Sequence, residues 1–176
     1  MKYDLVKHNR QSYRLKGYDY SSSGNYFVTV MVMDRECLFG KIRNGDVELS
    51  EIGKIADQCW QEIPEHFPNV KLDEYIIMPN HVHGIIEIIN NGGNLQRSGN
   101  AEFKSPSKTI GSIIRGFKIG VTKWCRNEMA DGFPSFRQIW QRNYHDHIIR
   151  NDHELNRIRQ YIVDNPLNWK RDRNDP

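Results

Sequence analysis

Two histidines, His81 and His83, lie two residues apart in the apolar stretch from Tyr75 to Ile89. The stretch predicts two β-strands joined by a tight turn at Pro79–Asn80. Because side chains alternate between the faces of a strand, both imidazoles point to the same face, about 6 to 7 Å apart along the strand. Two imidazoles on one face can hold a metal ion. The alternative is a pair of partly buried histidines whose hydrogen bonds are satisfied by neighbouring groups.

A tyrosine and an amide, Tyr161 and Asn165, lie four residues apart near the end of the chain. Apolar residues at helical spacing predict a last helix here, which begins at Asn151 or Asp152 and ends before Pro166. Residues four apart lie on the same face of a helix, so Tyr161 and Asn165 are neighbours. Their face borders the apolar stripe of the helix, and we expect it to lie at the edge of a cleft. The simpler alternatives are a packing tyrosine with its hydroxyl at the surface and an asparagine that only ends the helix. The apolar stripe consists of Leu155, Ile158 and Ile162.

The other elements follow from hydrophobic periodicity and turn residues. A small hairpin at a sheet edge is expected around Asn44-Gly45, a helix is expected after the N-cap Ser50, and a long helix is expected after the N-cap Ser107. The predicted strands are Asn25–Asp34, Leu38–Ile42, Val47–Leu49, Val70–Met78, His81–Asn90 and Phe136–Ile149.

This order of strands and helices predicts an α+β fold, in which one antiparallel sheet has helices packed mainly on one face, in a ferredoxin-like arrangement. We expect one domain over residues 25–167, with a mobile loop at about 90–106. Residues 1–24 are expected to form a basic, flexible lead-in, and residues 168–176 a polar tail.

Positive charge is concentrated in two places, although the net charge of the chain is only +3. The first sixteen residues contain Arg14 and four other basic residues against one acidic residue. The long helix has basic residues on its outer side and no acidic residue between Ser107 and Arg126. Clustered lysines and arginines bind phosphate backbones by releasing counterions, whereas the simpler interpretation is a solvated helix face. The candidate DNA-binding residues of the helix are Lys108, Arg115, Lys118, Lys123 and Arg126.

The composition excludes several classes of protein. The three cysteines are far apart and form no pair typical of a disulfide framework or a cysteine zinc site. The sequence contains neither an apolar run long enough to span a membrane nor an N-terminal signal peptide. We therefore expect a soluble, cytoplasmic protein without a membrane partner.

Four motifs together resemble those of the IS200-like and REP-associated tyrosine transposases, which are single-tyrosine HUH endonucleases. The likeness extends from about Arg14 to Trp169, with the motifs in the same order. They are Met78–Ile86 with its His-Val-His sequence, Arg115–Lys118 in the long helix, the run Trp140–Arg150, and Tyr161–Pro166 with its Tyr-Ile-Val-Asp-Asn-Pro sequence.

The resemblance implies an HUH nuclease fold and a metal-dependent enzyme that cleaves and rejoins single-stranded or hairpin DNA through a 5′-phosphotyrosine. It assigns the nucleophile to Tyr161 and the metal ligands to His81, His83 and Asn165. A phenol is a poor nucleophile at neutral pH, so a divalent ion that polarises the phosphate is chemically reasonable. Two imidazoles suit zinc or manganese better than magnesium, whereas the resemblance implies Mg²⁺ or Mn²⁺, which we adopt here.

Several alternatives remain open from the sequence. Tyr144 competes for the role of nucleophile, and His147 is expected to support the site or to contact DNA. The chain is expected to be a monomer or a homodimer. A hairpin-binding protein that does not cut is the second candidate function. A zinc hydrolase with His81 and His83 ranks last, because only Glu87 is available nearby as an acidic group.

Overall fold

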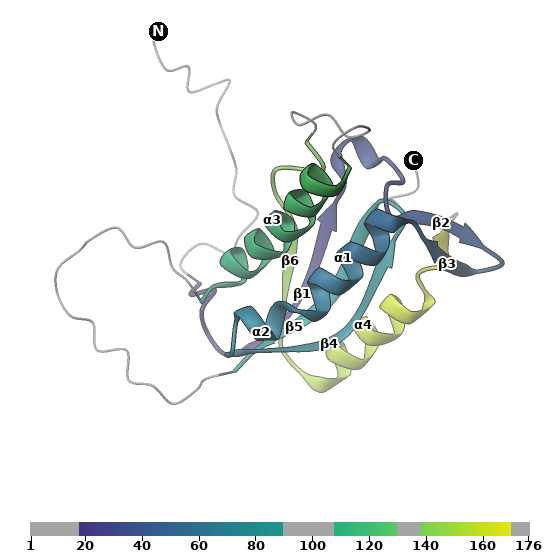
Figure 1. The fold of residues 1–176 in the computed structure, drawn as a ribbon. Helices are drawn as coiled ribbons and strands as arrows, with labels where there is room; N and C mark the ends of the chain where they lie inside the picture. The colour runs from purple at the N-terminus through teal and green to yellow at the C-terminus, as the bar shows by residue number, and fades with distance from the viewer. Residues whose placement is uncertain (1–17, 90–107, 130–137, 170–176) are drawn as a thin grey trace, which may run out of the picture.

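The computed structural model describes residues 18–89, 108–129 and 138–169 (Figure 1). Most of the lead-in with Arg14, the whole predicted loop, Phe136 and most of the tail lie outside these residues. The described part contains a four-stranded antiparallel sheet with the strand order β4-β5-β1-β6. The strands are β1 (Gly24–Met31), β4 (Val70–Met78), β5 (His81–Ile88) and β6 (His145–Ile149).

The helices lie on both faces of this sheet. On one face α1 and α3 pack against each other and form the crossovers β1-α1-β4 and β5-α3-β6 (Figure 1). Helix α4 follows β6 and packs on the opposite face. The predicted α+β fold with a ferredoxin-like arrangement is confirmed. The helices are α1 (Glu51–Gln61), α2 (Ile63–His66), α3 (Ile110–Glu128) and α4 (Asp152–Asp164), and a short 3₁₀ turn follows β1 at Met33–Arg35.

The main core lies between the sheet and the pair α1 and α3. Strand β5 sends its alternate side chains Val82 and Ile86 into this core, and Gly84 lies between them. A Cβ atom on Gly84 would lie 2.3 Å from Cζ2 of Trp60, which is fully buried. Gly84 is therefore required for the close approach of the Trp60 indole to the strand that carries the histidines.

A smaller core holds α4 against the other face of the sheet. Leu155, Ile158 and Ile162 of α4 pack with Ile85 of β5 and Ile149 of β6. This confirms the predicted apolar stripe of the last helix. Because Ile85 has the same parity along β5 as the two histidines, His81 and His83 point toward the face that α4 covers.

The helix boundaries agree with the sequence at α1 and α4 and differ at α3. The Ser50 hydroxyl accepts the N–H of Gly53, and the Asn151 side chain accepts the N–H of Glu154, as N-caps do. The predicted N-cap at Ser107 is wrong. Helix α3 begins after Thr109, which forms a reciprocal capping box with Ser112 and satisfies the first backbone donors.

The small hairpin does not sit at an edge of the main sheet, contrary to the prediction. Strands β2 (Gly40–Arg43) and β3 (Asp46–Leu49) form a separate two-stranded sheet, which projects from the domain (Figure 1). Asn44 and Gly45 form its turn with φ values of 53° and 89°, which explains the Asn-Gly signal. The turn contacts Leu167, which follows α4.

Strand β6 is much shorter than the predicted strand Phe136–Ile149. Trp140 forms only an isolated bridge with Val32, and its indole N–H donates to the backbone oxygen of Lys118 at 3.1 Å. The chain therefore turns toward α3 before it joins the sheet at His145. The sequence signal was ambiguous here because apolar residues do not alternate cleanly.

Replacing Gly84 with alanine is expected to destabilise the protein by about 1 to 3 kcal/mol, because the new methyl group meets a buried indole that cannot move away. Urea unfolding followed by tryptophan fluorescence measures the change. Gly116→Ala in α3 is the matched control, because its Cβ would lie 3.3 Å from the Phe67 ring. The control should stay within about 1 kcal/mol of the wild type. Equal stability of the two variants would contradict the packing argument.

Candidate active site

The two histidines are buried on the face that α4 covers. His81 is 0% exposed and His83 is 2% exposed, and their ring centroids are 4.4 Å apart. Both lie at the start of β5, next to the central strand β1. The predicted placement of both imidazoles on one face is confirmed.

Each ring nitrogen of His83 has a polar contact. Nδ1 lies 2.9 Å from the hydroxyl oxygen of Thr29, which is directly opposite on β1. Nε2 lies 3.2 Å from the hydroxyl of Tyr161 on α4. The Phe27 ring packs on both His83 and Tyr161, with centroid distances of 5.3 and 6.1 Å. The structure therefore brings Tyr161 to the histidine pair, as predicted.

His81 is oriented by its neighbour Asn80. The Asn80 side-chain N–H donates to the backbone oxygen of Arg35 at 3.1 Å, so its carbonyl oxygen faces His81 Nδ1 at 2.7 Å. A carbonyl oxygen can only accept, so His81 Nδ1 carries the proton and Nε2 carries the lone pair. The Trp169 indole stacks on the ring, with the planes 20° apart. Asn80 was predicted only as a turn residue.

Burial keeps both imidazoles neutral. It lowers the pKa of His81 to about 3. It also lowers the pKa of His83 well below the ordinary value, and the unfavourable electrostatic interaction with the nearby imidazoles of His81 and His145 lowers it further. A neutral imidazole has a lone pair for a metal ion or a hydrogen-bond donor without first losing a proton.

Two of the predicted site residues lie on α4 and at its C-cap. Tyr161 is 45% exposed, and its hydroxyl contacts the buried ring of His83. Asn165, one turn further along, is 2% exposed, and its carbonyl oxygen Oδ1 is buried without a hydrogen-bond partner within the described residues. A buried, unsatisfied carbonyl is costly unless it binds something.

The donors present fit a divalent metal ion. Within the described ranges, no three His, Cys, Asp or Glu side chains are placed to hold a metal. A third protein ligand would therefore be of another type, and the carbonyl oxygen of Asn165 has the required chemistry. Two imidazole nitrogens and one amide oxygen are acceptable to manganese and less typical of magnesium.

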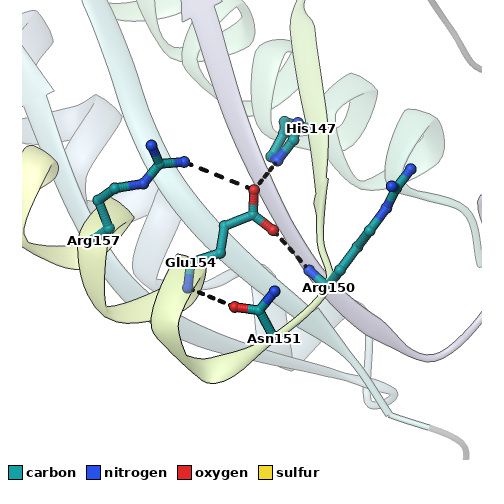
Figure 2. Close-up of polar contacts among 5 residues, drawn as sticks. All are labelled: His147, Arg150, Asn151, Glu154 and Arg157. Atoms are coloured by element: carbon teal, nitrogen blue, oxygen red, sulfur yellow. Dashed lines mark hydrogen bonds and ion pairs between the residues drawn. The ribbon is translucent and has the colours of Figure 1, made fainter.

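Helix α4 is anchored at both flanks by ion pairs. On one flank, the Glu154 carboxylate lies 2.8 Å from His147 Nε2 and accepts the backbone N–H of Arg150 at 3.0 Å (Figure 2). The guanidinium of Arg157 lies 3.9 Å from the same carboxylate. On the other flank, Arg159 donates to both oxygens of Asp73, where the β4 register shifts. The bond to Arg159 lowers the pKa of Asp73, and the bond to the Arg150 N–H lowers that of Glu154.

The two supporting candidates, His147 and Tyr144, have other described contacts. His147 joins β6 to the start of α4 through Glu154 and is about half exposed. Tyr144 packs against the main core, on the side of the sheet opposite the histidines. Among the described contacts, the tyrosine that reaches His83 is Tyr161.

The predicted basic surface of α3 is confirmed for three of its residues and wrong for Lys118. Arg115, Lys123 and Arg126 are exposed, as is Lys108 just before the helix. Lys118 instead turns inward, where its ammonium donates to the backbone oxygens of Gln141 and Asn143 and lies 5.9 Å from the Trp140 ring centroid. Burial lowers its pKa to about 8. The carbonyls that bind Lys118 lie 23 and 25 residues away in the sequence, so helical periodicity alone could not predict this inward position.

Comparisons with known proteins bear on the family and the fold of the chain. No protein-family model matches the chain. The chain is 46% identical over 179 residues to an uncharacterized protein of Haemophilus influenzae, across 97% of this chain and 96% of that protein. It is 24% identical over 151 residues to a Haemophilus influenzae protein provisionally named a REP-associated tyrosine transposase, across 85% of this chain and 73% of that protein.

The fold is similar to that of a REP-associated tyrosine transposase solved with a bound REP hairpin. The TM-score is 0.60 at 20% identity, over 91% of this chain and 74% of the other. The structure thus has a tyrosine-transposase fold, which confirms the resemblance seen in the motifs. The chain belongs to the same family as the 46% identical Haemophilus influenzae protein. None of the helices in the described ranges is long and apolar enough to cross a membrane.

Acid is expected to destabilise the metal-free protein through the buried histidines. Their pKa values in the folded chain are below the ordinary 6.5, so the unfolded chain binds more protons below that pH. The stabilisation is complete above pH 6.5 and is lost as the pH falls, by up to about 2 kcal/mol per histidine between pH 7 and 5. Urea unfolding at both pH values measures this loss.

The variant His81→Gln should lose about half of this pH dependence, because one of the two buried imidazoles is gone. His153→Gln removes an exposed histidine of α4 and serves as the control, with the wild-type dependence retained. A wild-type protein that is equally stable at pH 7 and 5 would show that the imidazoles are not held neutral by burial.

Proposed function

We propose that the protein is a transposase that cleaves and rejoins single-stranded DNA at hairpin-bearing ends of a mobile element, with Tyr161 as the nucleophile. The single observation that carries the proposal is the 3.2 Å contact between the hydroxyl of Tyr161, a residue that is 45% exposed, and the buried, neutral His83. Under this proposal, the contact keeps the attacking hydroxyl beside the two histidines that would hold the metal. The family resemblance and the fold of the hairpin-bound neighbour support the same function.

In the proposed reaction, the Tyr161 oxygen forms a bond to the scissile phosphorus and the bond from phosphorus to the 3′ oxygen breaks. The phenol loses its proton and the departing 3′ oxygen takes one up, which leaves a 5′-phosphotyrosine and a free 3′-OH. A 3′-OH at a new junction reverses the step. His81, His83 and Asn165 would hold Mg²⁺ or Mn²⁺, which polarises the phosphate when bound.

The second candidate function is a hairpin-binding protein that does not cut the DNA. The observation that favours it is the position of the basic residues. The exposed side chains of α3 lie on the face opposite the histidines, so a hairpin can bind there without reaching Tyr161. Under the transposase proposal, the same surface binds the hairpin while the single strand extends to the other face.

Tyr161→Phe is expected to abolish a covalent protein–DNA adduct, because it removes only the attacking oxygen. The assay incubates the protein with labelled hairpin DNA carrying a single-stranded flank and with Mg²⁺ or Mn²⁺, and separates the products under denaturing conditions. Tyr144→Phe is the matched control and should retain the adduct. EDTA should prevent adduct formation in the wild type. An adduct that persists in Tyr161→Phe and disappears in Tyr144→Phe would move the nucleophile to Tyr144.

Arg115→Gln and Arg126→Gln are each expected to weaken hairpin binding and to reduce the slope of log K against log salt by about 0.9, the effect of losing one phosphate contact. Fluorescence anisotropy across a salt series measures both quantities. Lys71→Gln removes an exposed charge on β4 and is the control. Lys118→Met should lower stability more than affinity, because Lys118 binds backbone carbonyls. Slopes unchanged in both arginine variants would exclude α3 as the DNA surface.

A further inference from the structure

Thr29 is a buried polar residue on the central strand β1 that the motifs do not include. Its side chain points to the α4 face, directly opposite His83 on β5 and His145 on β6. It is 9% exposed, and its hydroxyl lies 2.9 Å from Nδ1 of His83. Buried hydroxyls are retained where they form a required hydrogen bond.

The two contacts of His83 are coupled through its single ring proton. A neutral imidazole carries hydrogen on one nitrogen and a lone pair on the other. If Nδ1 donates to Thr29, Nε2 accepts from Tyr161 and is able to bind a metal. If Thr29 donates instead, Nε2 carries the proton and cannot be a ligand. The direction of the hydrogen bond from Thr29 therefore decides what His83 presents to Tyr161.

We propose that Thr29 is a positioning residue, whose hydroxyl accepts the Nδ1–H of His83 and leaves the Nε2 lone pair directed at α4. This inference rests on the proposed function, since only a ligand or an acceptor role needs that lone pair. His81 provides the parallel, because the carbonyl oxygen of Asn80 already fixes its proton on Nδ1. The two rings, 4.4 Å apart, then present the same nitrogen as the acceptor. Partners that fix the tautomer in this way are typical of histidine ligands.

The direct test is the tautomer of His83 in the metal-free protein, read from long-range correlations between ring protons and ring nitrogens in NMR. Wild type and Thr29→Ser, which keeps the hydroxyl, should show the proton on Nδ1. Thr29→Val has nearly the same shape but no hydroxyl, and should show the proton wholly or partly on Nε2. A wild-type proton on Nε2 overturns the proposal, even if Thr29→Val does not fold.

The second test is the affinity for Mn²⁺ alone, measured without DNA by electron paramagnetic resonance of the free ion. Thr29→Val should bind Mn²⁺ about 10- to 100-fold more weakly than wild type, the effect typical of losing a partner that orients a ligand. Thr29→Ser should bind within about threefold of wild type. Thr122→Val removes a hydroxyl that bonds to a backbone oxygen in α3 and controls for the substitution itself. Equal affinity of Thr29→Val and Thr29→Ser overturns the proposal.

These outcomes are distinguishable from failure of the proposed function. A wild-type protein that forms no DNA adduct but carries the proton on Nδ1 supports the role of Thr29 and contradicts the transposase. An adduct that forms normally in Thr29→Val, together with an unchanged tautomer, supports the transposase and contradicts the role of Thr29.

Discussion

The contact between Tyr161 and His83 is the interaction on which the candidate site depends, because it joins the last helix to the middle of the sheet. Its geometry requires α4 to lie at a fixed height and angle over β5. The small apolar core around Ile85 sets the height. The ion pair of Arg159 with Asp73 and the hydrogen bond of Glu154 with His147 hold the helix at its two flanks. Each exposed pair contributes little by itself, so their role is orientation more than stability.

The two faces of the sheet have different roles: one packs against the main core, and the other carries the histidines of the candidate site. Strand β5 alternates between them, so that Val82, Gly84 and Ile86 serve the main core while His81 and His83 face α4. The close contact of Trp60 with Gly84, the residue directly after His83, fixes the strand from the opposite face. The histidines are therefore positioned by packing on a face that they do not touch. This explains how two polar rings stay buried in neutral form without distorting the core.

Local features of the chain were predictable and long-range ones were not. The parity of His81 and His83, the cap at Ser50 and the Asn-Gly turn follow from the alternation of strands and from turn chemistry over a few residues. The inward turn of Lys118 depends on carbonyls more than twenty residues away, and the partner of His83 is 54 residues away in β1. Neither leaves a local pattern. The separate β2–β3 sheet was missed for the same reason, since pairing within a hairpin does not reveal whether a third strand joins it.

Two interactions compete for one atom of the candidate site, Nε2 of His83. His83 Nε2 has one lone pair, which can accept the Tyr161 hydroxyl or bind a metal ion, but cannot do both. If His83 is a ligand, the hydroxyl must leave it. Tyr161 is 45% exposed, so its ring has room to turn toward solvent, where a DNA phosphate would arrive. Asn165 is almost fully buried one turn away and has no such freedom. Under the proposed function, Asn165 would be the fixed oxygen donor and Tyr161 the movable nucleophile. The contact seen with Tyr161 is then the resting arrangement, which holds the hydroxyl next to the site until His83 is needed as a ligand.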